Sequence, residues 1–134
     1  MVSPFSLPES FMVKYKSIDD EHQELIDKIN DWVTQLNKGV LNDFPAKILV
    51  FIDQMKAHFA KEEAYMDDVS FPGLAWHKDH HTYFITAAQE LHKFALSGEK
   101  TQEEIIHTCF DYIVQDVIKA DLIFASFLHG KRLL

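Results

Sequence analysis

Residues 58–81 read HFAKEEAYMDDVSFPGLAWHKDHH and contain two pairs of side chains that commonly bind metals. His58 and Glu62 form the first pair, and His77 and His81 form the second, each at a spacing of four residues. Because residues i and i+4 lie on the same face of an α-helix, each pair can point at one spot. The Phe-Pro-Gly sequence at 71–73 predicts a turn between two antiparallel helices. Adjacent helices carrying such pairs are typical of metal sites in the cores of helical bundles.

Apolar residues recur at helical spacing through four segments of the chain. Only four Gly and four Pro occur in 134 residues, which favours long helices over many turns. Ser17, Asn42 or Asp43, and a Thr-Gln-Glu-Glu capping box at 101–104 are the expected helix starts, and Gly39 is an expected end. The expected helices cover about 18–38, 43–68, 74–96 and 101–129. This predicts an all-α fold: one domain over 1–134, with an irregular arm at 1–17 and an antiparallel up-down-up-down four-helix bundle at 18–129.

The composition restricts the classes of partner. The net charge of −8 argues against a nucleic-acid partner, because phosphate binding requires clustered Lys and Arg. No apolar run reaches the roughly 18 residues of a membrane span, and the N-terminal residues lack the pattern of a secretory signal. The single cysteine, Cys109, excludes an internal disulfide and is expected to be a small buried hydrophobic residue. We therefore expect a cytoplasmic protein without a membrane partner, and a monomer rather than an oligomer.

Polar residues on the expected buried faces indicate a metal site. A lone His on an apolar helix face is more often a hydrogen-bonded core residue than a ligand. Here His22 on the first helix and Asp121 on the fourth join the four ligand-type residues of 58–81. Because burying unpaired carboxylates costs several kcal/mol, a cation between them is the favoured explanation over a metal-free bundle. Imidazole and carboxylate ligands suit iron, manganese or zinc, and six or seven ligands suggest two ions. The remaining candidates are expected not to be ligands: His80, His92, His107, His129, Glu63 and Asp79.

Four motifs occur in a fixed order along residues 18–128. They are Ile18-Asp-Asp-Glu-His22-Gln-Glu-Leu25, His58-Phe-Ala-Lys-Glu62-Glu63, His77-Lys-Asp-His-His81-Thr-Tyr-Phe84 and the late Asp121. Together they resemble the ligand motifs of the hemerythrins, and they are most similar to those of the single-domain bacterial members. The resemblance implies a four-helix bundle around two non-haem iron ions, with an oxo or hydroxo bridge, that binds O2 reversibly.

The same resemblance implies a role for each residue. His22 and His58 would bind the iron with an open position for O2, and His77 and His81 would bind the other iron. Glu62 and Asp121 would bridge the two ions. Four residues match positions that line the O2 pocket of the family: Phe59, Tyr112, Ile113 and Val117.

Asp116 departs from the family pattern, which has a His five residues before the bridging Asp. Either Asp116 ligates iron in place of that imidazole, or its side chain is too short and leaves the position to water or nothing. Direct ligation is favoured because an unpaired carboxylate at this place would be costly. A further carboxylate stabilises the higher oxidation state of the iron and brings the ligand set closer to that of di-iron oxidases.

Three functions are compatible with this ligand set. The first is reversible O2 binding for storage, transport and delivery, or sensing. The second is a di-iron peroxidase or oxidase acting on H2O2, O2 or NO, which the carboxylate of Asp116 favours. The third is a signalling module that responds to O2 or iron through a separate protein partner.

Overall fold

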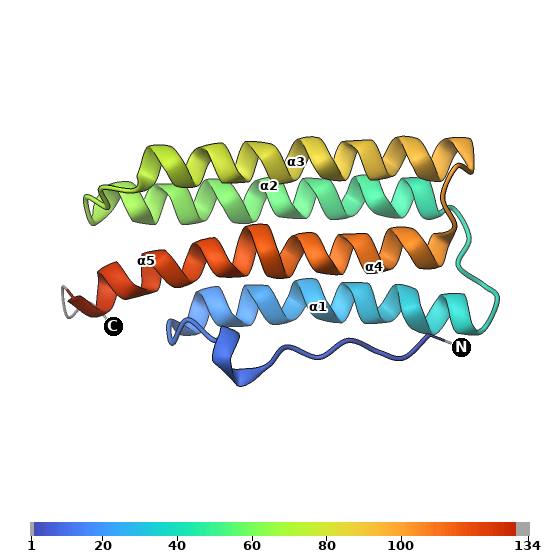
Figure 1. Ribbon diagram of the computed structural model, residues 1–134, viewed down its shortest axis with the longest axis horizontal. Coiled ribbons are helices and arrows are strands. Elements are labelled where there is room, and N and C mark those ends of the chain that lie inside the picture. Colours follow the sequence, from blue (N-terminus) through green and yellow to red (C-terminus); the bar gives the residue numbers. More distant parts are fainter. Residues whose placement is uncertain (1, 131–134) are drawn as a thin grey trace.

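The computed structural model describes residues 2–130, apart from the side chain of Asp116, and these residues form an antiparallel helical bundle (Figure 1). A short 3-10 turn, η1, covers Glu9–Phe11. The bundle helices are α1 (Lys16–Asn37), α2 (Phe44–Asp68), α3 (Leu74–Ser97) and a last helical stretch made of α4 (Gln102–Tyr112), η2 (Ile113–Ile118) and α5 (Lys119–Gly130). No strand occurs within residues 2–130. The predicted all-α four-helix bundle is therefore confirmed.

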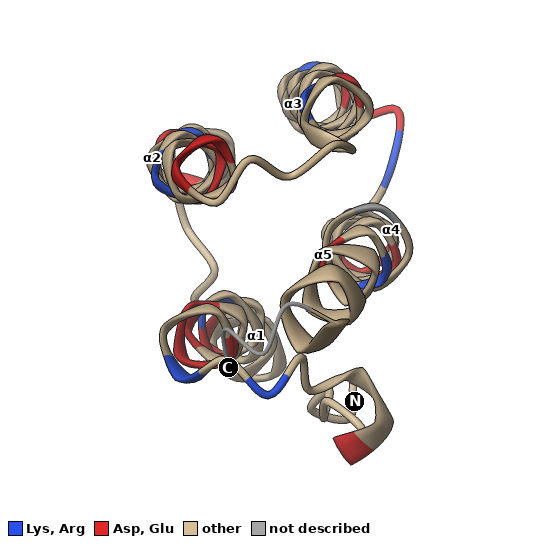
Figure 2. Cartoon of the chain, turned by 90° about the vertical axis from the view of Figure 1, so that its left-hand side faces the viewer, with Lys and Arg blue, Asp and Glu red and all other residues tan. Residues whose placement is uncertain are grey.

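Neighbouring helices of the bundle run in opposite directions around a shared core. In the view along the bundle, α1, α2, α3 and the α4–α5 stretch stand at four corners (Figure 2). The closest packing is between α2 and α3, and α1 packs against α4. None of the helices between residues 2 and 130 is both long and apolar enough to cross a membrane.

Two of the expected helix boundaries have the predicted local chemistry. Thr101 and Glu104 form the capping box, in which the Glu104 N–H donates to Thr101 Oγ1 over 3.1 Å. Gly39 adopts a left-handed φ of +71°, and its N–H donates to the carbonyl of Leu36 at the end of α1. Such a conformation costs glycine little, so the chain turns away from the helix at this residue.

The expected cap at Ser17 is wrong, because α1 already begins at Lys16 without a capping side chain. Instead, the buried carboxylate of Asp19 accepts the N–H groups of Val13 and Lys14 over 2.7 and 3.0 Å. Lys14 has a left-handed φ of +66°, which turns the arm back onto the first turn of α1. Asp43 does occupy the N-cap of α2, but in a left-handed conformation that makes no side-chain cap hydrogen bond.

The sequence predicted one continuous α-helix at the end of the chain. This prediction is wrong. Residues Ile113–Ile118 form a π-helical segment, and the N–H of Lys119 donates to the carbonyl of Val114, five residues earlier. A π turn holds more residues than an α turn and therefore shifts the register of the buried face. The shift occurs just before Asp121, whose side chain is fully buried.

The arm is fastened along α1 by two asparagines. Asn37 accepts the Val2 N–H over 2.8 Å and donates to the Val2 carbonyl over 2.7 Å. Asn30 makes the same pair of bonds with Phe5, over 2.7 and 2.8 Å. Phe5 then stacks on Phe110 of α4, so the arm covers the line where α1 meets α4.

The hydrophobic core consists of two clusters. The larger one holds most of the buried apolar side chains, whereas the smaller one lies toward the start of α1 and the end of α5. On α1, Ile18 belongs to the smaller cluster and Leu25 to the larger. On the last helix, Phe124 belongs to the smaller cluster and Ile118 to the larger. The smaller cluster is formed by Val13, Ile18, Met66, Phe71, Phe124, Ala125 and Leu128.

Candidate metal centre

A single buried polar layer lies between the two hydrophobic clusters. Six of the seven predicted ligands lie in it, with exposed fractions between 0% and 7%, and the side chain of the seventh, Asp116, is outside the described residues. They come from every helix of the bundle: His22 from α1, His58 and Glu62 from α2, His77 and His81 from α3, and Asp121 from α5. The spacing of four residues on α2 and α3 turns each pair inward, as the sequence predicted.

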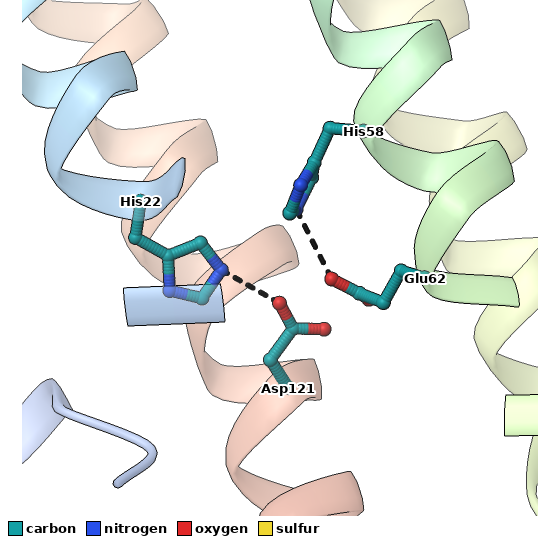
Figure 3. Close-up of side chains that lie close together, drawn as sticks. All are labelled: His22, His58, Glu62 and Asp121. Atoms are coloured by element: carbon teal, nitrogen blue, oxygen red, sulfur yellow. Dashed lines mark hydrogen bonds and ion pairs between the residues drawn. The ribbon is translucent and has the colours of Figure 1, made fainter. Parts of the chain in front are cut away.

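One half of the layer is formed by His22, His58, Glu62 and Asp121 (Figure 3). His22 Nε2 lies 2.7 Å from Asp121 Oδ2, and His58 Nε2 lies 3.0 Å from Glu62 Oε2. One ligand atom from each of the four side chains lies within 4.8 Å of all the others. That clustering is compact enough for one cation.

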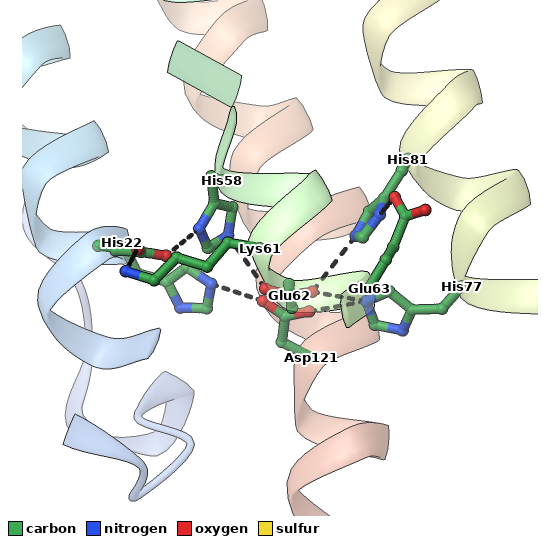
Figure 4. Close-up of polar contacts among 9 residues, drawn as sticks. His22, His58, Lys61, Glu62, Glu63, His77, His81 and Asp121 are labelled. Atoms are coloured by element: carbon green, nitrogen blue, oxygen red, sulfur yellow. Dashed lines mark hydrogen bonds and ion pairs between the residues drawn. The ribbon is translucent and has the colours of Figure 1, made fainter. Parts of the chain in front are cut away.

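The other half joins His77 and His81 to the same two carboxylates (Figure 4). His77 Nε2 lies 2.9 Å from Glu62 Oε1 and 2.8 Å from Asp121 Oδ1. His81 Nε2 lies 3.3 Å from Glu62 Oε1. These four side chains also offer ligand atoms within 4.8 Å of one another.

Glu62 and Asp121 each divide their two oxygens between the halves. Glu62 directs Oε2 to His58 and Oε1 to the imidazoles of α3. Asp121 directs Oδ2 to His22 and Oδ1 to His77. Two carboxylates shared by two imidazole pairs are the ligand arrangement of a dinuclear centre.

The hydrogen bonding within the layer is incomplete. His58 Nε2, His81 Nε2 and Glu62 Oε2 are fully buried and have no hydrogen-bond partner among the described residues, although they lie near one another. Buried polar atoms in folded proteins nearly always have a partner, so three converging orphans indicate a missing cation. The donor set of imidazole nitrogens and carboxylate oxygens, without a thiolate, fits iron.

Without a metal, protons rather than cations balance the charge of the two buried carboxylates. Burial alone would raise the pKa of Glu62, but close contacts with Asp121 and with three imidazoles keep it well below its usual range. Burial and the adjacent Glu62 charge raise the pKa of Asp121. Burial disfavours protonation of His58 and His77, but the surrounding carboxylates raise the pKa of each to about 9. Protons thus occupy the metal-free layer, and bound cations would displace them.

The family model of the hemerythrin HHE cation binding domain matches residues 13–120. The chain belongs to the hemerythrin family. Hemerythrins contain a di-iron centre, which agrees with two ligand groups that share two carboxylates. The match ends one residue before Asp121, so the contribution of Asp121 to the layer is an observation of the structure.

Curated relatives of this hemerythrin include bacteriohemerythrins and myohemerythrins. A bacteriohemerythrin of Methylococcus capsulatus is 23% identical over 82% of this chain and 85% of its own length. A myohemerythrin of Riftia pachyptila is 32% identical over 66% of this chain and 69% of its own. Myohemerythrin-1 of Phascolopsis gouldii is 30% identical over 61% of this chain and 69% of its own. No solved structure matches the chain significantly.

Sequence reasoning missed the carboxylates that contact the outer nitrogens of the histidines. Glu63 was expected to be solvated, but its Oε2 lies 2.8 Å from His81 Nδ1. Glu21, to which the sequence assigned no role, contacts His58 Nδ1 and accepts a hydrogen bond from Lys61. Consecutive residues on a helix point about 100° apart. Lys61 therefore faces α1, Glu62 faces the interior and Glu63 faces α3 (Figure 4). This difference in direction was the signal in the sequence that could have indicated contacts to both neighbouring helices.

The residues predicted to line an O2 pocket lie on the side of the larger cluster. Phe59, Ile113 and Val117 are buried in it, and Tyr112 packs against it partly buried. The Phe59 ring is stacked on the imidazole of His81. Asp116 belongs to the π-helical segment by its backbone, and its side chain lies outside the described part of this hemerythrin.

The other histidines lie outside the two ligand groups. His80 packs beside the ring of Trp76 on the outer face of α3, with centroids 4.1 Å apart. His107 meets the edge of Phe5 beneath the arm. Cys109 is buried and free, as expected.

Proposed function

We propose that this hemerythrin binds O2 reversibly at two iron ions, and that residues 1–134 form one domain with an arm at 1–17 and a bundle at 18–129. Two bound iron ions would supply electrons to O2 when it binds and recover them when it leaves. The proposed ligands are His22, His58, His77, His81, Glu62, Asp116 and Asp121.

The observation that supports this most is the division of the Glu62 and Asp121 oxygens between two imidazole pairs. A mononuclear site would not need both oxygens of both carboxylates. In our assignment, Asp116 completes the half that contains His77 and His81. The half that contains His22 and His58 then has one ligand fewer, and the open position for O2 lies there.

The apolar side chains around the layer would protect bound O2 from water. Phe59, Ile113 and Val117 are at most 3% exposed. Their side chains offer no proton donor, so they lower the local polarity and slow the protonation steps that turn a carrier into an oxidase.

The first experiment is metal analysis followed by optical spectroscopy of the reduced protein. We expect two iron ions per chain, a new visible band on exposure to O2, and loss of the band when O2 is removed under vacuum. Fewer than two iron ions, or immediate and irreversible oxidation without a band, would contradict reversible binding.

A peroxidase or oxidase acting on H2O2, O2 or NO is the second candidate, and the acidic residue Asp116 favours it. An extra carboxylate would make the reduced centre easier to oxidise. Turnover separates the two functions, because an enzyme consumes its added substrate, whether H2O2, O2 or NO, over many cycles whereas a carrier does not. Storage, transport and sensing of O2 all start from the same reversible binding.

A further inference from the structure

Two cavities open into the groove between α1 and α2. One has a volume of about 250 Å3, lies beside Tyr15 and Tyr65, and reaches Glu62. The other has a volume of about 350 Å3 and reaches His58. Glu21 and Lys61 line both. The first cavity continues toward the start of α1 and the second toward its middle, so the side chains of these two residues separate the cavities.

Glu21 and Lys61 join the two helices across this groove. Lys61 Nζ donates to Glu21 Oε1 over 2.8 Å, and the other oxygen of Glu21 contacts His58 Nδ1. The side chain of Lys61 is 69% exposed, that of Glu21 23% and that of His58 5%. The chain of contacts therefore leads from solvent to a proposed iron ligand in two steps.

The two halves of the centre differ in these outer contacts. In the half with His81, the orienting carboxylate is Glu63 of α2, the helix next to α3, one residue after the shared Glu62. In the half with His58, it is Glu21 of α1, the helix next to α2, and Glu21 is also held by a lysine. The Nδ1 atoms of His22 and His77 are buried and have no hydrogen-bond partner among the described residues. Each half thus contains one imidazole with an orienting carboxylate.

We propose that Glu21 is a positioning residue for His58, and that its ion pair with Lys61 covers the groove through which the metal ion of the His22–His58 half exchanges with solvent. A carboxylate at Nδ1 fixes the ring orientation and leaves the Nε2 lone pair for the metal. Removing such a partner typically weakens metal binding 10- to 100-fold. The proposal rests on the metal-binding part of the proposed function and is independent of O2.

Release of Co2+ from the loaded protein tests the proposal. Metal-free protein is loaded with two Co2+ per chain and mixed with excess EDTA, and the loss of visible absorption is followed. We expect two phases, one for each half. Glu21→Gln should accelerate one phase by about tenfold. Lys61→Met, which leaves Glu21 in place, should accelerate the same phase by a smaller factor.

Two further variants serve as controls on α1 and α2. Glu63→Gln should accelerate the other phase, because Glu63 contacts His81. Glu24→Gln changes a residue that lines the second cavity, and it should release both ions at the wild-type rates. Thermal melting of the metal-free variants identifies any loss of folding. Lys61→Met, at an exposed side chain, keeps the test available if Glu21→Gln unfolds.

The outcomes separate this proposal from the proposed function. If Glu21→Gln and Lys61→Met leave both phases unchanged, or accelerate both equally, the positioning role is overturned. A protein that shows the expected phases with Co2+, but does not bind O2 reversibly with iron, would contradict only the O2 assignment. A protein that binds no Co2+ would contradict the metal centre itself.

Discussion

The ring of Phe59 lies flat on the imidazole of His81, with centroids 3.8 Å apart and planes within 7° of each other. Phe59 also meets Phe84 edge to face, so a buried aromatic side chain holds the ring of a proposed ligand. Phe59 therefore acts on the site in two ways, because it fixes a ligand and excludes water.

Replacement of Phe59 by Leu should affect stability and the iron site together. We expect the metal-free protein to lose about 1–2 kcal/mol of unfolding free energy, and the reduced iron form to oxidise faster in air because water gains access. Phe44→Leu is the matched control, since Phe44 is equally buried but contacts Trp32 away from the layer. Equal oxidation rates in the two variants would show that Phe59 does not protect the centre.

The identity of residue 116 should set the reduction potential of the di-iron centre. A carboxylate ligand removes one positive charge from the centre and so stabilises the ferric state. We therefore expect Asp116→His to raise the reduction potential and to lengthen the lifetime of the reduced protein in air. Electrochemistry on both proteins measures the shift. An unchanged or lower potential in the variant would argue that Asp116 does not ligate iron.

The Cys109 thiol gives a pH dependence that is independent of the metal ligands. Burial raises its pKa far above the ordinary value, so the folded protein keeps the thiol protonated. The unfolded chain ionises it near pH 8.5, and above that value the folded state binds about one more proton than the unfolded state. Stability contributed by the neutral thiol is therefore complete below about pH 8.5 and falls by about 1.4 kcal/mol per pH unit above it.

The check is a comparison of slopes between wild type and Cys109→Ala. The variant loses packing at every pH, but its unfolding free energy should fall less steeply between about pH 9.5 and 10.5. Denaturant unfolding at several pH values, with both proteins metal-free, gives the two slopes. Parallel slopes would mean that the thiol ionises in the folded state.

Gly73 should tolerate no side chain, because Phe71 lies over it. A Cβ at residue 73 would lie 2.6 Å from the Phe71 ring. Phe71 packs against Phe124, with ring centroids 5.0 Å apart, so it cannot move without disturbing the smaller cluster. We expect Gly73→Ala to cost about 1–3 kcal/mol. Gly130→Ala, where the added atom meets nothing within 4 Å, should change the melting temperature little.

Much of the fold followed from local signals in the sequence. The i, i+4 pairs at His58 and His77 predicted both helices and their inward faces, because helical periodicity fixes direction. The capping box at Thr101 was equally local. The π-helical segment at Ile113–Ile118 was not, since apolar residues spaced by four fit either kind of turn, and the surrounding packing selects between them.

The contacts around the proposed ligands depend on neighbouring helices. Nothing in the acidic run before His22 distinguishes Glu21, which contacts His58, from Asp19, which binds the backbone of the arm. Both assignments require knowing how α1 is rotated against α2. Glu63 posed the same problem, because an acidic side chain one residue after a ligand is usually solvated.

The polar layer divides the core, so charge rather than apolar contact joins the two hydrophobic clusters at that level. The smaller cluster, which includes Val13 and Leu128, therefore packs against the rest of the core only through the groups in the polar layer. Without metal, only protons shared among the carboxylates and imidazoles balance the charge there, while the larger cluster still holds the remainder folded. The local order of this end of the molecule would then depend on the iron supply, whereas the overall fold would not change.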